Sequence, residues 1–270
     1  MLPNLGIIAG KGSLPSLIAG NYKKQGGNCY IAAIEGEADI ELIKDFEYQP
    51  LKLGMVGAAI KYFTQYNVQN IIFIGGVDRP NFKNLAVDKI GGLLLLKIIS
   101  QKIRGDDNLL RIVAKFFENY GFKVISSSEI YQNQQCDSTI ITDTSPTNSD
   151  KKDIEFGVKL LNHLSKFDIG QSVIVEDGYV LGIEAAEGTD NLIARCADLR
   201  KKSCAGVLIK LSKIGQDNRL DLPTIGINTI KNLVKYNYKG VAIQKNQVII
   251  AEEKKTIKLA NEHKIFITKC

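Results

Sequence analysis

Short apolar segments alternate with longer amphipathic segments through the first half of the sequence. The apolar segments are LGIIAG, CYIAAI and NIIFIGG, and a stretch of helical periodicity follows each of them along the chain. The third is apolar throughout, which is typical of a strand buried on both faces of a parallel sheet. Strands that alternate with helices predict a parallel sheet with right-handed crossovers. The pattern therefore predicts a Rossmann-like α/β domain over residues 1–130.

A polar segment separates this half from the rest of the chain. The stretch YQNQQCDSTIITDTSPTNSDKK is rich in Ser, Thr, Asn and Asp, and it predicts a linker over residues 131–151. Beyond it, Asp177 and Gly178 between two apolar runs predict a β-hairpin. Residues 240–250 predict a second strand pair. We therefore expect a C-terminal mixed α/β domain over residues 152–270, and we expect it to carry the catalytic residues.

Composition argues against several classes of protein. The five cysteines are odd in number and show no C-x-x-C spacing, and the two histidines lie far apart, so we expect neither disulfides nor a zinc site. The formal net charge of +6 suits an anionic partner, but no nucleic-acid-binding signature occurs, so we expect no nucleic acid. The most apolar stretch, residues 90–100, is too short to span a bilayer, and the N-terminus lacks a signal peptide. These features predict a cytoplasmic protein.

Two loops of the first half follow apolar strands. In GIIAGKGSLP, Gly10 and Gly12 would let a phosphate approach the backbone at a helix N-terminus, or they serve a tight turn only. In GGVDRP, Asp78 and Arg79 come after the third strand, where open α/β sheets bind ligands. The alternative for this pair is an ion pair that holds the loop.

Two further motifs place acids at helix starts. In GDDNLLR, Asp106 or Asp107 would cap a helix, and the second acid is then available for a ligand. In EAAEGTD, Thr189 can cap the next helix with Asp190 in its first turn. Capping does not explain Glu184, which follows an apolar strand.

The loop SKIGQDNRLDLPTIG combines acids and bases with a stiffening proline. Lys210, Lys213 and Arg219 stand near Asp217 and Asp221. Carboxylates bind a hard cation such as Mg²⁺, and lysine or arginine binds phosphoryl oxygens. The loop therefore predicts a metal-phosphate site, with a surface ion-pair network as the alternative.

Taken in order, GIIAGKGSLP, GGVDRP, GDDNLLR, DIGQSVIVEDGYVLGIEAAEGTD and GQDNRLDLPTIG resemble the UDP-2,3-diacylglucosamine pyrophosphatase family of the LpxI type. The resemblance covers nearly the whole chain. It implies a two-domain cytosolic enzyme of lipid A synthesis in a Gram-negative bacterium. Such enzymes use Mg²⁺ to hydrolyse UDP-2,3-diacylglucosamine to UMP and 2,3-diacylglucosamine 1-phosphate (lipid X), with water attack on the α-phosphorus. One departure is Lys11, which stands where the family has a middle glycine.

The resemblance also implies roles for individual residues. The family's essential aspartate stands in an Arg-x-Asp-Leu-Pro motif, which makes Asp221 the first catalytic candidate, Asp217 the second and Asp190 the third. We expect Asp221, Asp217 and Glu187 to bind the metal. The residues expected to bind substrate are Gly10, Gly12, Asp78, Arg79, Asp106, Asp107, Thr189, Lys210, Lys213 and Arg219.

Other functions remain open at this stage. One alternative is a non-catalytic nucleotide or lipid sensor of the same fold. Another is a dinucleotide-dependent oxidoreductase with Glu35 as the acid after the second strand, although the glycine fingerprint is incomplete. Because the implied substrate carries acyl chains, we expect peripheral association with the cytoplasmic face of the inner membrane. The LLLL helix either shields acyl chains or is plain core. The oligomeric state does not follow from the sequence.

Overall fold

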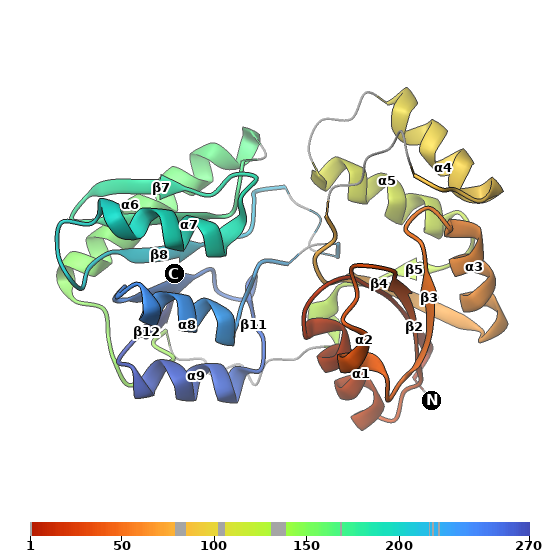
Figure 1. Ribbon diagram of the computed structural model, residues 1–270, viewed down its shortest axis with the longest axis horizontal. Helices are drawn as coiled ribbons and strands as arrows, with labels where there is room; N and C mark the ends of the chain where they lie inside the picture. The colour runs from red at the N-terminus through yellow and green to blue at the C-terminus, as the bar shows by residue number, and fades with distance from the viewer. Residues whose placement is uncertain are drawn as a thin grey trace. The chain divides into compact units, whose positions relative to one another are not determined.

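The computed structural model describes residues 2–78, 85–101, 106–130, 139–167, 169–215, 217, 219–220 and 222–270, with the side chains of Asp106 and Asp107 left aside. The chain forms two compact units, each built on its own sheet (Figure 1). Unit 1 comprises Met1–Gln132 and Asp217–Asp221, and unit 2 comprises Asn133–Gln216 and Leu222–Cys270. The five-residue segment Asp217–Asp221 thus belongs to unit 1, although its neighbours in the sequence belong to unit 2.

Unit 1 confirms the predicted parallel sheet. Its strands pair in parallel in the order β3-β2-β1-β4-β5. The strands are β1 (Asn4–Ala9), β2 (Cys29–Ile34), β3 (Glu47–Leu51), β4 (Val68–Ile74) and β5 (Lys123–Val124). The helices are α1 (Leu14–Lys24), α2 (Ile40–Ile43), α3 (Val56–Gln65), α4 (Lys89–Ser100), α5 (Asp106–Glu118) and the 3-10 turn η1 (Ser127–Glu129). The direction of strand addition reverses between β1 and β4, which is where doubly wound folds bind ligands.

The central strand β1 supplies both faces of the unit 1 core. Leu5, Ile7 and Ala9 are fully buried and pack with residues of α1 and α2. Ile8 points to the opposite face, where α3, α4 and α5 contribute the core. The sequence did not predict β3, because it is an edge strand that contains Pro50 and has no fully buried residue.

Unit 2 confirms the predicted mixed sheet, with strand order β12-β10-β8-β6-β7. Strands β8, β10 and β12 run parallel, and β6 is antiparallel to both β8 and β7. The strands of this sheet are β6 (Ser172–Glu176), β7 (Tyr179–Ile183), β8 (Val207–Lys210), β10 (Gly240–Ile243) and β12 (Phe266–Lys269). The helices are α6 (Asn148–Leu164), α7 (Gly188–Cys196), α8 (Ile227–Lys235), α9 (Glu253–Glu262), and the 3-10 turns η2 (Ser165–Phe167) and η3 (Ala197–Leu199).

The predicted strand pair within residues 240–250 is wrong. Strand β10 lies between β8 and β12 in the large sheet. Strand β11 (Ile249–Ile250) pairs in parallel with β9 (Thr224–Ile225) instead. The two strands are close in sequence, yet each finds its partner elsewhere in the chain.

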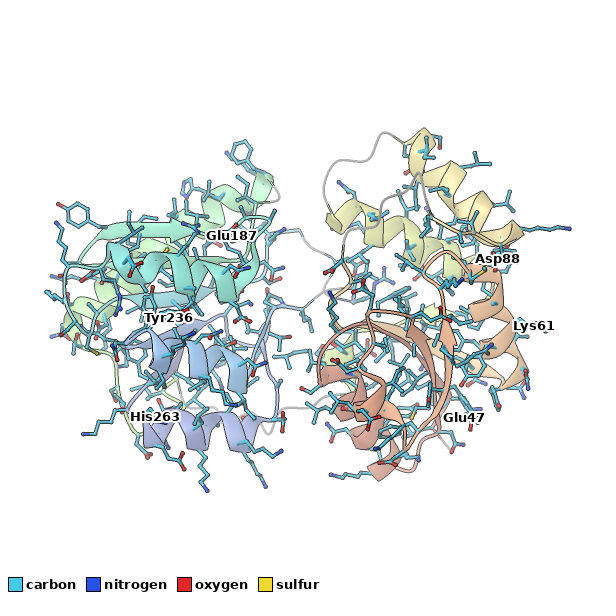
Figure 2. The ribbon with its side chains drawn as sticks, in the orientation of Figure 1. Glu47, Lys61, Asp88, Glu187, Tyr236 and His263 are labelled. Atoms are coloured by element: carbon cyan, nitrogen blue, oxygen red, sulfur yellow. The ribbon has the colours of Figure 1, made fainter. Side chains whose placement is uncertain are left out.

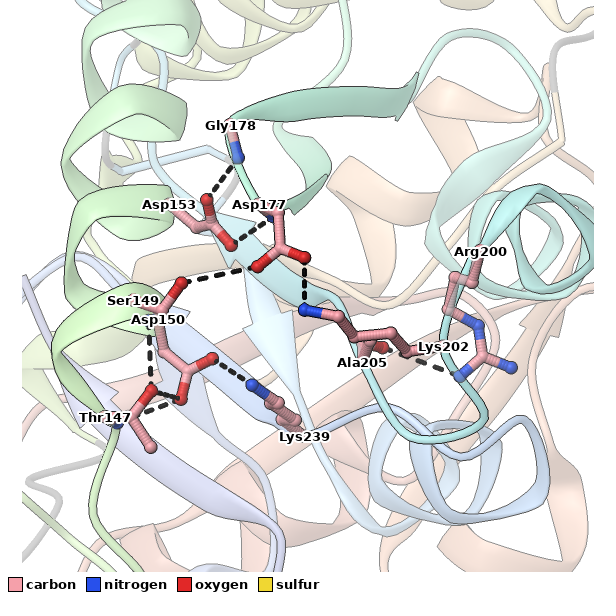
Figure 3. Close-up of polar contacts among 10 residues, drawn as sticks. All are labelled: Thr147, Ser149, Asp150, Asp153, Asp177, Gly178, Arg200, Lys202, Ala205 and Lys239. Atoms are coloured by element: carbon pink, nitrogen blue, oxygen red, sulfur yellow. Dashed lines mark hydrogen bonds and ion pairs between the residues drawn. The ribbon is translucent and has the colours of Figure 1, made fainter.

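The predicted hairpin at Asp177 and Gly178 is confirmed as the connection between β6 and β7. Both residues have positive φ angles, 48° and 79°, which suits a tight two-residue turn. Asp153 of α6 accepts hydrogen bonds from the backbone N–H groups of both turn residues, at 2.9 and 2.7 Å (Figure 3). Asp177 in turn pairs with Lys202. These acids therefore hold the hairpin against α6.

The described part of the predicted linker, residues 139–151, is built into unit 2. The backbone N–H of Ile141 donates to Ile267, and Lys269 donates to Thr139, so this stretch runs beside β12. Thr147 and Asp150 then form a reciprocal capping box at the start of α6. Asp150 is buried and pairs with Lys239 at 2.8 Å (Figure 3).

Candidate functional site

The loops after β1 and β4 meet at the point where the strand order reverses. The backbone N–H of Lys11 donates to Gly76 at 2.8 Å, and Gly76 donates back to Lys11 at 3.3 Å. A Cβ atom on Gly10 would lie only 2.3 Å from the carbonyl oxygen of Gly76. Position 10 therefore requires glycine because of the neighbouring loop, whether or not a ligand also binds there.

Acidic side chains surround these loops. The Lys11 ammonium pairs with Asp78 at 2.7 Å and with Glu37 at 3.4 Å. The hydrogen bond to Asp78 raises the pKa of Lys11. The backbone N–H of Gly12, expected to face a phosphate, donates to the carboxylate of Asp39 at 2.6 Å. A phosphate at Gly12 would have to displace this carboxylate. Asp78 thus forms an ion pair with Lys11, and an ion pair that holds this loop was the predicted alternative to ligand binding.

Three residues of this unit that are expected to bind substrate remain predictions. Arg79 lies outside the described residues. Asp106 and Asp107 are the first residues of α5, at the helix start as predicted, but their side chains are outside the description.

The segment Asp217–Asp221 docks on α5 and the neighbouring strands of unit 1 through Leu220. The Leu220 side chain is 4% exposed and packs with Ala114 of α5 and Val124 of β5. Partly buried Phe73 and Leu110 complete the contact. An apolar anchor from a distant part of the chain therefore explains why this segment belongs to unit 1.

Arg219 links the same segment to α5. Its guanidinium pairs with Glu118 at 2.8 Å and also donates two hydrogen bonds to Asp217, at 2.9 and 2.7 Å. Hydrogen bonds from Arg219 hold the pKa of the Asp217 carboxyl below its usual range. Both oxygens of Asp217 therefore accept from a cation, and the group stays ionised. Asp221 follows Leu220 in sequence and lies outside the described residues.

In unit 2 a partly buried polar cluster lies at the carboxyl end of β8. The Lys210 ammonium, on a residue only 9% exposed, donates to the Thr189 hydroxyl at 2.8 Å. That hydroxyl donates to Glu184 at 2.9 Å, and Ser172 lies 3.4 Å from it. Glu184 also accepts from the backbone N–H of Gln171. The cluster thus joins Thr189 and Lys210, which are expected to bind substrate, to Glu184, the acid that helix capping did not explain.

The predicted cap at Thr189 is wrong, because α7 begins one residue earlier, at Gly188. Glu187 precedes the helix and makes no side-chain cap (Figure 2). Asp190 lies in the first turn, as predicted, and accepts from Asn232 of α8 at 2.9 Å. The Thr189 hydroxyl is thereby free of the capping role and contacts Lys210 and Glu184 instead.

Glu187 pairs with an arginine of its own unit. Arg195 donates two hydrogen bonds to one carboxylate oxygen of Glu187, at 3.0 and 2.8 Å, and the N–H of Ala185 donates to the other. The hydrogen bonds from Arg195 lower the pKa of Glu187. Lys213 is half-buried in the loop that follows β8.

The predicted metal site stays a prediction that the described residues alone do not test. Among them, no three His, Cys, Asp or Glu side chains converge closely enough to hold a metal ion. Glu187 belongs to unit 2 and Asp217 to unit 1, and each is engaged by an arginine. The third expected ligand, Asp221, lies outside the described residues.

Glu118, Asp39 and Arg195 are among the partners in these networks that were not predicted from the sequence. Glu118 lies 101 residues before its partner Arg219, so no local pattern could link them. Asp39 precedes the short helix α2 and reaches Gly12 across 27 residues. The pairing of Arg195 with Glu187 was the easiest of the three to predict, since Arg195 lies two helical turns after Glu187 on α7.

Both halves of the chain match models of known protein families. A family model described as the LpxI N-terminal domain matches residues 4–134, and one described as the LpxI C-terminal domain matches residues 137–268. The chain is 30% identical over 269 residues to UDP-2,3-diacylglucosamine pyrophosphatase LpxI of Caulobacter vibrioides. That alignment covers 97% of this chain and 96% of the relative. In the described part of the chain, no helix is both long and apolar enough to cross a membrane.

Proposed function

The chain belongs to the LpxI family, and on this premise we propose that it hydrolyses UDP-2,3-diacylglucosamine to UMP and 2,3-diacylglucosamine 1-phosphate in lipid A biosynthesis. The observation that carries the proposal is the match of both domain models in chain order, together with an alignment over 97% of the chain. A match of this extent covers both domains of the family and not one of them alone.

The proposed reaction is attack of water on the α-phosphorus of the diphosphate. A bond forms between the water oxygen and this phosphorus, and the bond from the phosphorus to the bridging oxygen breaks. The bridging oxygen leaves with the sugar lipid as its 1-phosphate, and the uridine half leaves as UMP. Protons released from water pass to the solvent and to a carboxylate acting as base.

Geometry supports separate roles for the residues of the motif. Asp221 is the proposed base or water-orienting group, because it is the acid of the Arg-Leu-Asp-Leu-Pro motif itself, and Asp217, two residues before the motif, is held by Arg219. Lys210 and Thr189 offer an ammonium and a hydroxyl side by side, which suits contact with phosphoryl oxygens. Asp217 is better explained as the group that orients Arg219 than as a base, because its pKa is lowered.

Magnesium dependence is part of the proposal, but the described acids fit a dedicated magnesium cage poorly. Arginines engage Asp217 and Glu187, and no described cluster of three ligands exists. Magnesium is commonly held by one or two carboxylates together with substrate phosphates. We therefore propose Asp221 as its carboxylate ligand and assign no ligand role to Glu187.

The test is release of UMP from UDP-2,3-diacylglucosamine in detergent micelles, with and without EDTA. We expect release that EDTA abolishes and that added Mg²⁺ restores. Asp221→Ala should lose activity, whereas Asp198→Ala, at an exposed position in η3, should keep it. Binding of substrate without any UMP release would favour the sensor alternative. Undiminished release in EDTA would reject the magnesium requirement alone.

We also propose that the protein associates peripherally with the cytoplasmic face of the membrane. The proposed substrate carries two acyl chains and resides in a bilayer, so the enzyme has to work at a lipid surface. The formal net charge of +6 favours an anionic surface, with a contribution that salt weakens.

A further inference from the structure

Helix α4 exposes an apolar face to solvent. Leu93, Leu96 and Ile99 are 57%, 65% and 62% exposed, and their spacing of three residues places them along one side of the helix. We call these three residues the outer face of α4. Among the described residues, no other helix has more than one large hydrophobic side chain exposed to this degree. Isolated exposed apolar residues need no explanation, but a contiguous stripe marks a site of interaction.

The opposite side of α4 is firmly packed, so the exposure is not a result of fraying. Leu94 is 5% exposed and lies in the core that α3 and α5 share, with Ile90 and Ile98 packed around it. Figure 1 shows α4 at the outside of unit 1, next to α3 and α5. The fold therefore holds the outer face of α4 away from the core of unit 1.

The start of α4 is fixed to α3 by a shared cap. Asp88, which Figure 2 labels, accepts from the N–H of Gly91 at 2.7 Å, and it also accepts from the N–H of Ala58 in α3 at 3.0 Å. A Cβ atom on Gly91 would lie 2.0 Å from the carbonyl oxygen of Gly54, so the two backbones are in close contact. This double attachment sets the direction in which the outer face points.

The charges on α4 indicate what covers the outer face. The helix carries Lys89 and Lys97 and has no acidic residue between Lys89 and Ser100. Lysine side chains can lay their methylene stems on apolar surface while their ammonium groups reach outward. Two copies of this face brought together would bring the lysines of both helices close to one apolar contact. An anionic lipid surface instead offers acyl chains to the leucines and phosphates to the lysines.

We propose that the outer face of α4 is the membrane-docking surface of this protein, and that it inserts shallowly into the interface of an anionic bilayer. The proposal rests on the proposed function only in that a lipid-linked substrate brings the enzyme to a membrane. It adds the residues that make the contact. It does not assign the outer face to the acyl chains of the bound substrate.

Flotation of the full-length protein with lipid vesicles tests the proposal without any substrate. Vesicles of phosphatidylcholine alone are compared with vesicles that also contain phosphatidylglycerol, each at low and high salt. The test variant is Leu93→Gln with Leu96→Gln and Ile99→Gln, all at exposed positions where glutamine is compatible with the helix. The matched control replaces three exposed leucines elsewhere, Leu2, Leu42 and Leu199, by glutamine.

We expect wild type and control to float with the anionic vesicles. The test variant should bind at least about tenfold more weakly, because apolar burial at the interface scales with the area inserted. Lys89→Gln should weaken binding to anionic vesicles by on the order of fivefold and leave binding to phosphatidylcholine unchanged. All variants should have the circular dichroism spectrum of wild type.

Three outcomes would overturn the proposal. In the first, the test variant binds vesicles as well as wild type does, and in the second, the wild type binds neither kind of vesicle. In the third, wild type self-associates and the test variant has a different sedimentation coefficient, which would assign the outer face of α4 to contact with a second copy. UMP release in detergent micelles separates this result from the proposed function. The test variant should retain wild-type release there, whereas failure of the proposed function is the absence of UMP release from wild type itself.

Discussion

Replacing Leu220 by alanine tests whether docking of the segment Asp217–Asp221 on unit 1 matters for catalysis. Leu220 is 4% exposed and is the apolar anchor of this segment. A buried Leu→Ala change costs about 2–5 kcal/mol of unfolding free energy. The surrounding cluster is small, with Ala114 and Val124 as its other buried members, so we expect the lower end, about 2–3 kcal/mol.

The ion pair of Arg219 with Glu118 contributes less to docking than Leu220 does. The two side chains are 43% and 34% exposed, so solvent screens their attraction. Exposed pairs of this kind contribute roughly 0–1 kcal/mol. Glu118→Gln should therefore destabilise unit 1 much less than Leu220→Ala. If catalysis requires the docked segment, a loss of about 2 kcal/mol lowers kcat/KM by up to about 30-fold.

The assay combines urea unfolding with UMP release in detergent micelles, measured well below the unfolding transition. Leu94→Ala is the matched control, because Leu94 is about as buried in unit 1 and lies in a different core cluster from Leu220. It should lose similar stability and keep its turnover. The reasoning is refuted if folded Leu220→Ala turns over at the wild-type rate, or if Leu94→Ala loses as much turnover as Leu220→Ala.

Three further predictions concern other parts of the molecule. Asp221→Ala should cut single-turnover rates at least ~10²-fold, and Asp217→Ala should cost less; the reverse order would make our assignment wrong. Gly10→Ala should lower the melting temperature, with a loss of about 1–3 kcal/mol, because its Cβ would lie 2.3 Å from the oxygen of Gly76; an unchanged melting temperature would contradict the observed loop contact. Burial raises the pKa of Asp150, but hydrogen bonds from its lysine and threonine partners outweigh burial and lower it. Because a lowered carboxyl pKa stabilises the fold above the unfolded-state pKa, stability of unit 2 should fall as pH drops below about 4, and Asp150→Asn should reduce that dependence in urea unfolding at several pH values.

The sequence predicted the parts of the fold that depend on burial. Parallel strands covered on both faces are apolar throughout, so β1, β2 and β4 were evident from composition alone. The edge strand β3 has one open side and contains Pro50, so its sequence carries no such signal. The partner of β11 could not be predicted either, because the pairing with β9 is decided by packing and not by distance along the chain.

The candidate site was predicted less completely, since polar partners come from distant elements. The capping rule assigned the Thr189 hydroxyl to backbone amides of its own helix. In the structure Lys210, from the end of β8, donates to that hydroxyl at 2.8 Å instead. Residue type and a position near a helix start were sufficient to single out Thr189, but its partners followed only from the arrangement of the sheet.

The acids of this chain differ in what their surroundings leave them able to do. Asp217 and Glu187 accept hydrogen bonds from arginine, and this lowers the pKa of each. A carboxylate held in this way stays ionised and is a weak base, because protonation would cost it the ion pair. These two acids, which were expected to bind a metal, therefore each hold an arginine side chain in place. A sequence shows how often acids and bases alternate but not which of them pair. Of the two acids in the loop that contains the Arg-Leu-Asp-Leu-Pro motif, Asp217 pairs with Arg219, so we expect the chemistry of the proposed reaction to depend on Asp221.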